Sequence, residues 1–358
     1  MERILGSSAV YAALQLSAAM VLSTATAQAA DESPLPPPEY AIAATWALGG
    51  AGGWDYLALE ASGARLFISR GDRVDVVETA SGKLAGSIPN TLGVHGIAFA
   101  PELKRGYTSN GRANTVTVFE LDTLRTVKEA AVSGIKPDAI LYEPQRQHVF
   151  TANGASSNLS VLDPQTLEIL STIALPGPPE FMATDGSGSV FVNIETDPGK
   201  LVLIDAKALE VKGVWPLTGC ANPTGLAIDR VQHRLFSVCD NQVMAVTDSV
   251  SGKQVAQVAI GKGPDAAAFD PDLGNVFSSN GADGTLTIIH EDAPDKYRVI
   301  TTLSTQKSAR TMALDQPTHR IFLAAATPGE SPPPTPDQPH PRPGMIPGSF
   351  VILVAKPK

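Results

Sequence analysis

Cysteine, charge and aromatic residues are all scarce in this 358-residue chain: it has two cysteines, 18% charged residues and 6% aromatic residues. The two cysteines form no Cys-x-x-Cys motif, which argues against a thioredoxin-like redox site. The net charge of -9 argues against a general nucleic-acid binder, which needs a basic face. No apolar run after residue 29 is long enough to span a bilayer.

Local signatures of several enzyme classes are missing too. The sequence has no Gly-rich phosphate loop and no Ser-His-Asp set with a local signature. Basic and aromatic residues do not interleave, and no haem or quinone attachment motif supports a role as redox partner. Any function must therefore come from residues that the fold brings together.

Glycine and proline, in contrast, are abundant, with 31 and 29 copies, while 43% of the residues are hydrophobic. Helix interiors tolerate neither glycine nor proline well, so long helices are disfavoured. The hydrophobic content is ordinary for a globular chain and disfavours global disorder. The composition predicts an all-β protein of many short strands joined by turns.

The N-terminus has the features of a signal peptide. Residues 10–29 are apolar and rich in small residues, and they end in Ala27-Gln28-Ala29, a typical signal-peptidase site. The alternative, a membrane anchor, is disfavoured because this apolar stretch is short and diluted with Ser, Thr and Gln. We therefore predict a signal peptide at 1–29, a Pro-rich linker at 30–39, and a periplasmic or secreted protein.

An internal repeat of about 42 residues organises the rest of the chain. It is marked by an aromatic residue inside an apolar run, at Phe67, Tyr107, Phe150, Phe191, Phe236, Phe277 and Phe322. Before each aromatic comes a short apolar run, most often centred on Ala, and then an acidic residue that opens a turn. After it, several copies carry Asn-Gly, for which we expect the positive φ of a tight hairpin.

Four antiparallel strands per repeat, seven times over residues 40–358, predict a seven-bladed β-propeller. The last copy has only three strands before the chain ends. The segment 40–48 precedes the first copy and has the pattern of a fourth strand. We expect it to complete the last blade and so to close the ring without a long free sheet edge.

The Asn-Gly ends, in the forms Thr-Ser-Asn-Gly, Thr-Ala-Asn-Gly and Ser-Ser-Asn-Gly before a Val/Leu-rich strand, resemble the YVTN-type repeat. From about residue 40 the chain resembles the YncE-like family of exported propellers. The stretches that carry this resemblance are Trp54-Asp55-Tyr56, 93–98, 192–195 and 347–350. The resemblance implies a propeller fold and export, and it transfers no reaction.

In a propeller, the loop before each innermost strand and the loop after each second strand lie around one mouth of the central channel. The positions before the inner strands are Asp55, His95, Asp138, Glu180, Thr224, Asp265 and Arg310. The loops after the second strands add Arg70, Asn110, Asn153, Glu195, Asp240 and Asn280. With Trp54 and Tyr56 beside Asp55, all of these except Thr224 and Asp240 form our candidate ligand-binding set.

Two interpretations of this mouth remain open. In the first, the polar groups only pair across a water-filled channel, with Arg310 neutralising Asp265 or Asp55. In the second, the mouth binds a small molecule or an exported partner protein, without catalysis. A variant of the second is a lyase or lactonase-like hydrolase that uses His95, Arg310 and Asp138, since crowded carboxylates raise one another's pKa values. That variant rests on analogy with other propeller enzymes.

A metal site is open as well. Three histidines precede second strands and His290 ends a third strand, so we expect only His95, and His340 in the loop of the last blade, near the mouth. No multi-histidine zinc set is therefore available. A hard cation such as Ca²⁺ could be held by Asp138, Glu180 and Asp265 with Asn side chains.

Two further features complete the prediction. Cys220 precedes an inner strand and Cys239 ends the adjacent one, so we expect a disulfide between them, which also fits export. Residues 327–348 form a Pro-rich insertion in the last blade, either a flap or docking segment over the mouth or a disordered loop. We expect a monomer.

Overall fold

The structure, a computed structural model, describes residues 38–331, 333 and 344–358, and this part of the chain is built from antiparallel strands. The predicted signal peptide and residues 30–37 of the linker lie outside the described residues. Helical structure is limited there to two short 3₁₀ turns, η1 (Pro101–Leu103) and η2 (Gln316–Thr318). The all-β prediction is therefore confirmed.

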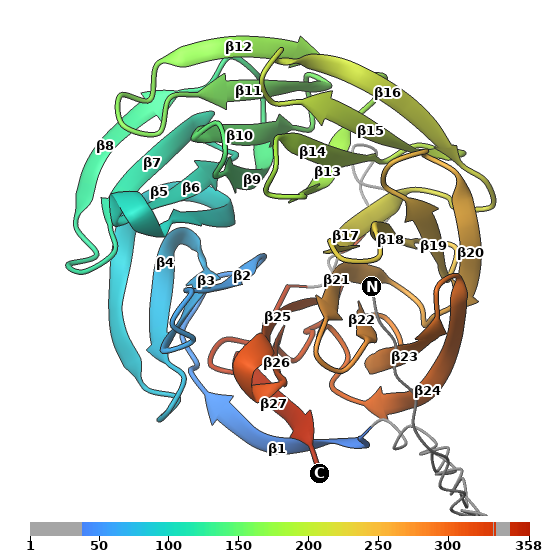
Figure 1. Cartoon of the computed structure of the whole chain (residues 1–358). Helices are drawn as coiled ribbons and strands as arrows, with labels where there is room; N and C mark the ends of the chain where they lie inside the picture. Colours follow the sequence, from blue (N-terminus) through green and yellow to red (C-terminus); the bar gives the residue numbers. More distant parts are fainter. Residues whose placement is uncertain (1–37, 332, 334–343) are drawn as a thin grey trace, which may run out of the picture. The chain divides into compact units, whose positions relative to one another are not determined.

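Six sheets form in the described residues, and five of them have four strands each. They are arranged radially in a ring (Figure 1). The first three of these five, in chain order, contain β9 (Pro137–Glu143), β10 (His148–Asn153), β11 (Asn158–Leu162) and β12 (Ile169–Ala174); β13 (Pro179–Thr184), β14 (Ser189–Ile194), β15 (Gly199–Asp205) and β16 (Glu210–Leu217); and β17 (Pro223–Asp229), β18 (Arg234–Cys239), β19 (Val243–Asp248) and β20 (Gln254–Ala259). The other two contain β21 (Pro264–Asp270), β22 (Asn275–Asn280), β23 (Thr285–Ala293) and β24 (Lys296–Ser304); and β25 (Thr311–Asp315), β26 (Arg320–Ala325), β27 (Val351–Pro357) and β1 (Tyr40–Ala47).

The sixth sheet has seven strands because one strand serves two neighbours. Its strands are β2 (Leu57–Leu59), β3 (Arg65–Ser69), β4 (Gly71–Glu78), β5 (Leu84–Ala100), β6 (Arg105–Asn110), β7 (Thr115–Glu120) and β8 (Thr126–Ala131). The first half of β5 pairs with β4 and its second half with β6. The repeat predicted two separate strands here. The structure has one continuous strand instead. This strand turns at Asn90 and Gly93, where φ is positive, and so changes its partner from β4 to β6.

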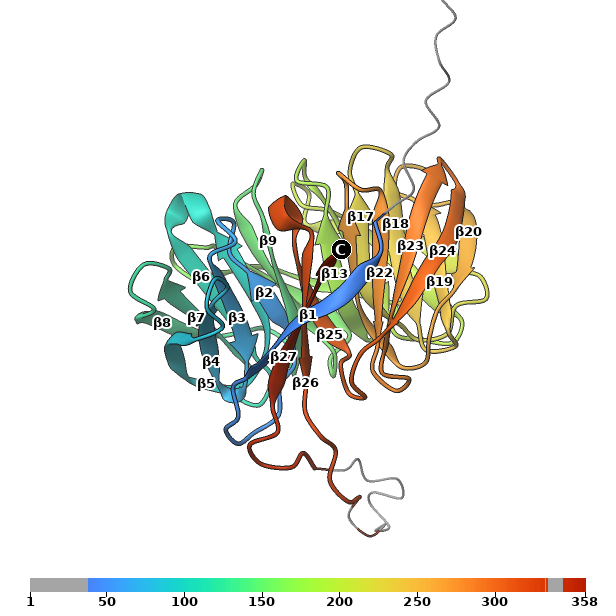
Figure 2. The same ribbon diagram turned by 90° about the horizontal axis from the view of Figure 1, so that it is seen from below.

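The ring is closed by β1, which pairs with β27 along its whole length (Figure 2). The prediction that the N-terminal segment supplies the fourth strand of the last sheet is thus confirmed. Aromatic contacts hold β1 in place: the ring of Tyr40 lies 5.4 Å from that of Phe277, and the ring of Trp46 lies 5.4 Å from that of Phe322. The inner strands contact one another in the order β2, β5, β9, β13, β17, β21 and β25, and β25 returns to β2.

The core lies between neighbouring sheets. All seven aromatic residues that mark the repeat are buried, and each lies in the strand next to an inner strand. Valine, leucine and isoleucine from the facing strands pack around them in separate clusters, such as the one that contains Phe150, Val190 and Val202. Burial of apolar surface between sheets is therefore what fixes the ring and, with it, the positions of the inner strands.

The expected role of the Asn-Gly pairs is wrong. Neither Asn110 nor Gly111 has a positive φ, and the same holds for the pairs at 153–154 and 280–281. Glycine is required at two of these positions by close approach: a Cβ on Gly111 would lie 2.8 Å from Nε2 of His95, and one on Gly281 would lie 2.6 Å from Cβ of Arg310. Gly111 and Gly281 thus make room for side chains of the candidate site, whereas a Cβ on Gly154 would have 3.9 Å of space.

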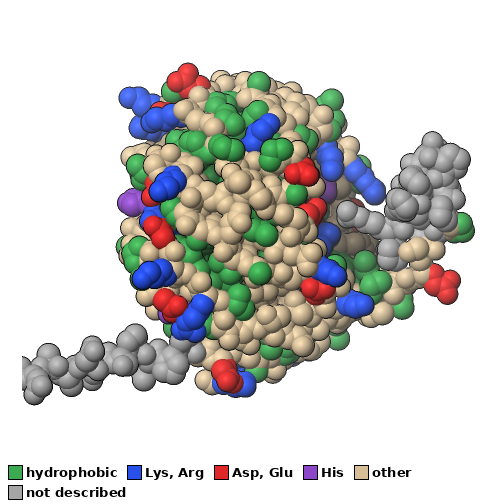
Figure 3. Space-filling model, turned by 90° about the vertical axis from the view of Figure 1, so that its right-hand side faces the viewer, with side chains coloured by type: hydrophobic (Ala, Val, Ile, Leu, Met, Phe, Trp, Pro, Cys, Tyr) green, Lys and Arg blue, Asp and Glu red, His purple; other side chains and the backbone are tan. Residues whose placement is uncertain are grey.

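A disulfide joins Cys220 to Cys239, as predicted, and both cysteines are buried. In the described part of the chain, no helix is long and apolar enough to cross a membrane. On the outer wall seen in Figure 3, basic and acidic side chains alternate without forming a patch of one sign.

Candidate functional site

The positions before the inner strands converge on one cavity of about 450 Å³. Each of them lies at or just before the N-terminal end of its inner strand, except His95, which follows the turn inside β5. Because the inner strands surround the axis of the ring with the same polarity, these ends meet at one mouth. The lining residues are Asp55, His95, Lys136, Asp138, Glu180, Glu195, Thr224, Asp240, Gly263, Pro264, Asp265 and Arg310.

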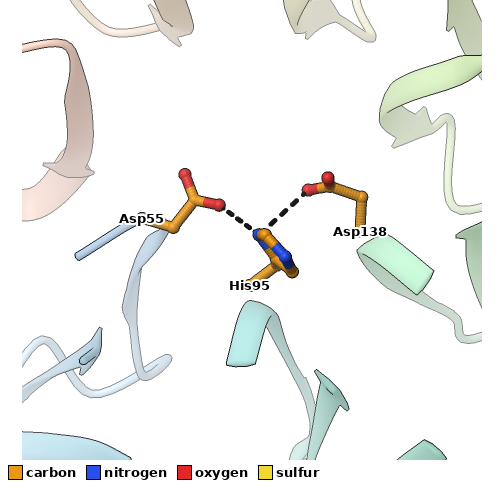
Figure 4. A group of neighbouring side chains, drawn as sticks. All are labelled: Asp55, His95 and Asp138. Carbon is orange, nitrogen blue, oxygen red and sulfur yellow. Dashed lines mark hydrogen bonds and ion pairs between the residues drawn. The ribbon is translucent and has the colours of Figure 1, made fainter. Parts of the chain in front are cut away.

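Three of these side chains form a compact cluster. Nδ1 of His95 lies 2.5 Å from Oδ2 of Asp55 and 3.6 Å from Oδ1 of Asp138. Figure 4 shows the imidazole between the two carboxylates, each carried by a different part of the ring. Since His95 lies beside Gly111, which leaves space for its ring, the local sequence permits this position of the imidazole.

Arg310 extends the cluster on the other side of Asp55. Its Nη2 lies 3.3 Å from Oδ1 of Asp55, and its Nε lies 3.0 Å from Oδ2 of Asp265. Charges therefore alternate around half of the mouth, from Asp265 through Arg310 and Asp55 to His95 and Asp138. From the sequence, we expected Arg310 to neutralise Asp265 or Asp55, and Arg310 pairs with both.

Two of the mouth carboxylates, Asp138 and Glu180, have raised pKa values. Burial, together with the charge of Asp55, raises the pKa of Asp138 to about 6, although His95 opposes this. Burial and the charges of Asp138 and Glu195 raise the pKa of Glu180 well above its usual value. A cation in the mouth would allow both groups to ionise.

For His95, burial acts to lower the pKa, but the hydrogen bond with Asp55 and the charge of Asp138 outweigh it. The pKa of His95 is therefore raised above 6.5. The imidazole thus holds its proton to a higher pH than a free histidine does. When protonated, Nδ1 donates to Oδ2 of Asp55, whereas Asp138, 3.6 Å away, acts through its charge.

An aromatic pair lies beside the mouth. Tyr56, which precedes β2, stacks on Phe181 of β13 with 5.2 Å between ring centroids. Both rings line a separate cavity of about 20 Å³ that shares Asp55 and Asp265 with the mouth. Burial and the nearby carboxylates raise the pKa of Tyr56, so its phenol stays neutral. We call the mouth cavity the cup.

Other residues of the candidate set lie elsewhere. Asn110, Asn153 and Asn280 are buried and do not line the cavity. Each donates from its side-chain amide to the next strand, as Asn110 does to Thr115 and Thr117. The three asparagines therefore tie hairpins together. Trp54 and Arg70 lie in the wall of a neighbouring cavity that also reaches Asp55.

Sequence reasoning missed Lys136 and Arg112. Lys136 lines the mouth two residues before Asp138, and Arg112 lines the neighbouring cavity directly after Gly111. Their closeness in sequence to repeat positions could have identified both residues. Our alignment used only one position per loop and therefore did not include them. The insertion reaches the same region, since Gly344 and Met345 line a third cavity with Trp54 and Arg310. His340 lies outside the described residues.

In the described residues, Asp55, His95 and Asp138 also form a group whose potential ligand atoms all lie within 4.8 Å of one another. One imidazole nitrogen and two carboxylates form a donor set that suits Mn²⁺, Fe²⁺ or Zn²⁺. A divalent ion bound there would replace the proton on Nδ1 of His95. The Ca²⁺ set expected from the sequence shares only Asp138 with this cluster.

Comparison with known proteins identifies the fold and no more. No family of known proteins matches the sequence, and no curated protein is similar to it. Among solved structures, a chain of hydrazine synthase from Kuenenia stuttgartiensis superimposes with a TM-score of 0.68. The likeness covers 76% of this chain and 92% of that chain at 16% sequence identity. It supports a propeller-like fold.

Proposed function

We propose that this chain is an exported seven-bladed propeller, similar to the YncE-like family, that binds a small cationic ligand in its mouth. The blade count follows if the seven-stranded sheet is taken as two blades that share β5, next to five blades of four strands. Export is supported by the disulfide, which is typical of oxidising compartments.

The observation that carries the proposal is the charge of the cup. Six carboxylates line one cavity of about 450 Å³, and the same lining carries two permanent cations, Lys136 and Arg310, besides His95. A cavity of this size suits a small molecule better than a protein surface. A cation would stabilise the ionised forms of Asp138 and Glu180, whose pKa values are otherwise raised.

An aromatic pair beside the cup adds a second source of attraction. Tyr56 and Phe181 stack on each other and line the small cavity that shares Asp55 and Asp265 with the cup. An amine or guanidinium on a short alkyl chain would match the carboxylates with its charge and this aromatic pair with its methylene groups.

Isothermal titration calorimetry with agmatine, a dication with an alkyl chain, tests this function. At pH 8 we expect binding to the wild type and about tenfold weaker binding to Asp138→Asn, because one ionised carboxylate of the cup is removed. Glu168→Gln, an exposed carboxylate outside the mouth, is the matched control and should bind as the wild type does. Absence of agmatine binding to the wild type would refute the proposal.

A second candidate function is favoured by the Asp55–His95–Asp138 cluster alone: a metal-dependent lyase or lactonase-like hydrolase. Here the three side chains would hold the ion, which would polarise a substrate carbonyl and lower the pKa of a bound water. Arg310 could then orient an anionic group of the substrate from its place beside Asp55.

Metal analysis distinguishes the two candidates. A metal enzyme should bind one Mn²⁺ or Zn²⁺ per chain, and Gly111→Ala should weaken this binding because the added Cβ displaces the imidazole. Gly154→Ala is the matched control, since its Cβ would have 3.9 Å of space. A wild type that takes up neither ion would rule this candidate out.

A further inference from the structure

A second cavity of about 600 Å³ lies beside the mouth and has the opposite charge. It shares Asp55, His95 and Arg310 with the mouth, so the two cavities meet at this trio. The charged residues in its wall are four arginines, at 70, 73, 112 and 310, against Asp55 and Asp72. The chain thus places an acidic and a basic compartment next to each other.

Two of the four arginines already have carboxylate partners. Arg73 binds Asp72 and Asp75 at 3.3 Å and 2.9 Å, and Arg310 binds Asp55 and Asp265. The other two, Arg70 and Arg112, have no carboxylate within 4.0 Å among the residues that the structure describes. Arg70 and Arg112 therefore carry the positive charge of this cavity that no described carboxylate offsets.

Of these two arginines, Arg70 is the stronger indication of an anion site, because it is only 1% exposed. Its guanidinium lies 3.7 Å from the ring centroid of Phe350, and Nη2 donates to the backbone oxygens of Gly49 and Ala51. Its Nε has no hydrogen-bond partner in the part of the chain that the structure describes. A buried guanidinium without a counter-ion is costly, and an anion in the adjoining cavity would offset that cost.

Other features of the wall fit an anion as well. Arg112 is exposed at the rim and extends from the loop that also carries Gly111. Trp54, whose indole N–H likewise has no acceptor, lines the cavity together with several glycines. Arginine is the side chain best suited to a planar carboxylate, which it can bind through two parallel hydrogen bonds.

We propose that this arginine cavity is an anion subsite and that the whole site binds a zwitterion, with its cationic end in the acidic cup and its carboxylate in the arginine cavity. This inference rests on the proposed function, since the cup supplies the cation subsite. Asp55, His95 and Arg310 form the shared boundary, so one molecule of amino-acid size can contact both compartments.

The pair L-arginine and agmatine tests the inference, because the two differ only by the α-carboxylate. Without an anion subsite, agmatine should bind better, since it carries the larger positive charge. With the subsite, we expect L-arginine to bind the wild type at least tenfold more tightly than agmatine. Arg112→Gln should bring the ratio of the two affinities close to one.

A second pair of variants tests the cavity without touching any arginine. A Cβ on Gly53 would have no atom within 4 Å, and this position lines the cavity. Gly53→Asp should abolish the preference for L-arginine through repulsion of the carboxylate, whereas the matched Gly53→Asn should keep it. A loss of preference in both variants would indicate a steric effect and would contradict the inference.

The outcomes separate the two proposals. If agmatine binds and L-arginine gains nothing, the anion subsite is refuted and the cationic function stands. If neither binds, the cationic function and the zwitterion both fail; inorganic phosphate binding that is lost in Arg112→Gln would then support a purely anionic site. If phosphate also fails to bind, the arginine cavity is not an anion subsite at all.

Discussion

Asp55 and His95 are 40 residues apart in sequence, yet the carboxylate of one lies 2.5 Å from Nδ1 of the other. The other oxygen of Asp55 faces Arg310, so this carboxylate links two cations at the mouth. The contact fixes a proton on Nδ1 of the imidazole. It thereby decides which protonation state of His95 a ligand would meet.

The first prediction concerns this proton. Asp55→Asn should lower the pKa of His95, because burial then acts against fewer opposing charges. A raised histidine pKa contributes stability that is present below about 6.5 and is lost as the pH rises through the raised value. NMR titration of the imidazole would measure the change. The chemical shifts of His319, whose partner is Asp270, should not move at fixed pH.

The second prediction concerns Asp138. Its pKa of about 6 is above that of an unfolded aspartate, so the folded chain binds more protons between about pH 4 and 6 and loses stability as the pH rises through that window. Asp138→Asn should match the wild type at pH 4 and exceed it at pH 8 by about 1–3 kcal/mol. Urea unfolding at both pH values measures this. A variant less stable than the wild type at pH 8 would contradict the assignment.

The third prediction concerns the disulfide. Cys220 and Cys239 close a loop over a sequence separation of 19 residues. Replacing both by alanine should lower the free energy of unfolding by about 3 kcal/mol, since the unfolded chain regains the entropy of that loop. Reductant during unfolding should weaken the wild type and leave the double variant unchanged. Equal stability of both proteins without reductant would argue against a stabilising role.

The fourth prediction concerns ring closure. A chain that begins at residue 49 lacks β1, so the edge of β27 is exposed and the contacts of Tyr40 and Trp46 are lost. We expect it to aggregate and to lose its cooperative thermal transition, whereas a chain that begins at residue 38 keeps both solubility and transition. Size-exclusion chromatography and calorimetry would compare them. Cooperative unfolding of the shorter chain would mean that the ring does not depend on β1.

Much of the fold could be predicted because the repeat is a local pattern. Phe150 and its equivalents, each buried between sheets, follow a short apolar run in every copy of the repeat. The same alignment placed Asp55, His95 and Asp138 at equivalent points, and equivalent points of a ring meet at one mouth. The disulfide followed for the same reason, since both cysteines fall at the ends of neighbouring strands.

Other features could not be predicted because they depend on which copies become neighbours in space. Nothing near Asn110 shows that its amide would bond Thr117 rather than face the channel. Lys136 and Arg112 belong to the site only through the curvature of their loops. The continuous strand β5 likewise depends on two neighbouring sheets that share it.

The sequence by itself determined the all-β class, the repeat, the closing strand and the residues that surround the axis, because each depends on hydrophobic periodicity and turn chemistry within one copy. Only the tertiary structure decided how their charges are distributed. It pairs Arg310 with two aspartates, leaves Arg70 buried with no carboxylate partner among the described residues, and separates an acidic cup from a basic cavity. Electrostatic interactions act through space between repeats that are distant in the sequence, so the charged partners are set only when the ring closes.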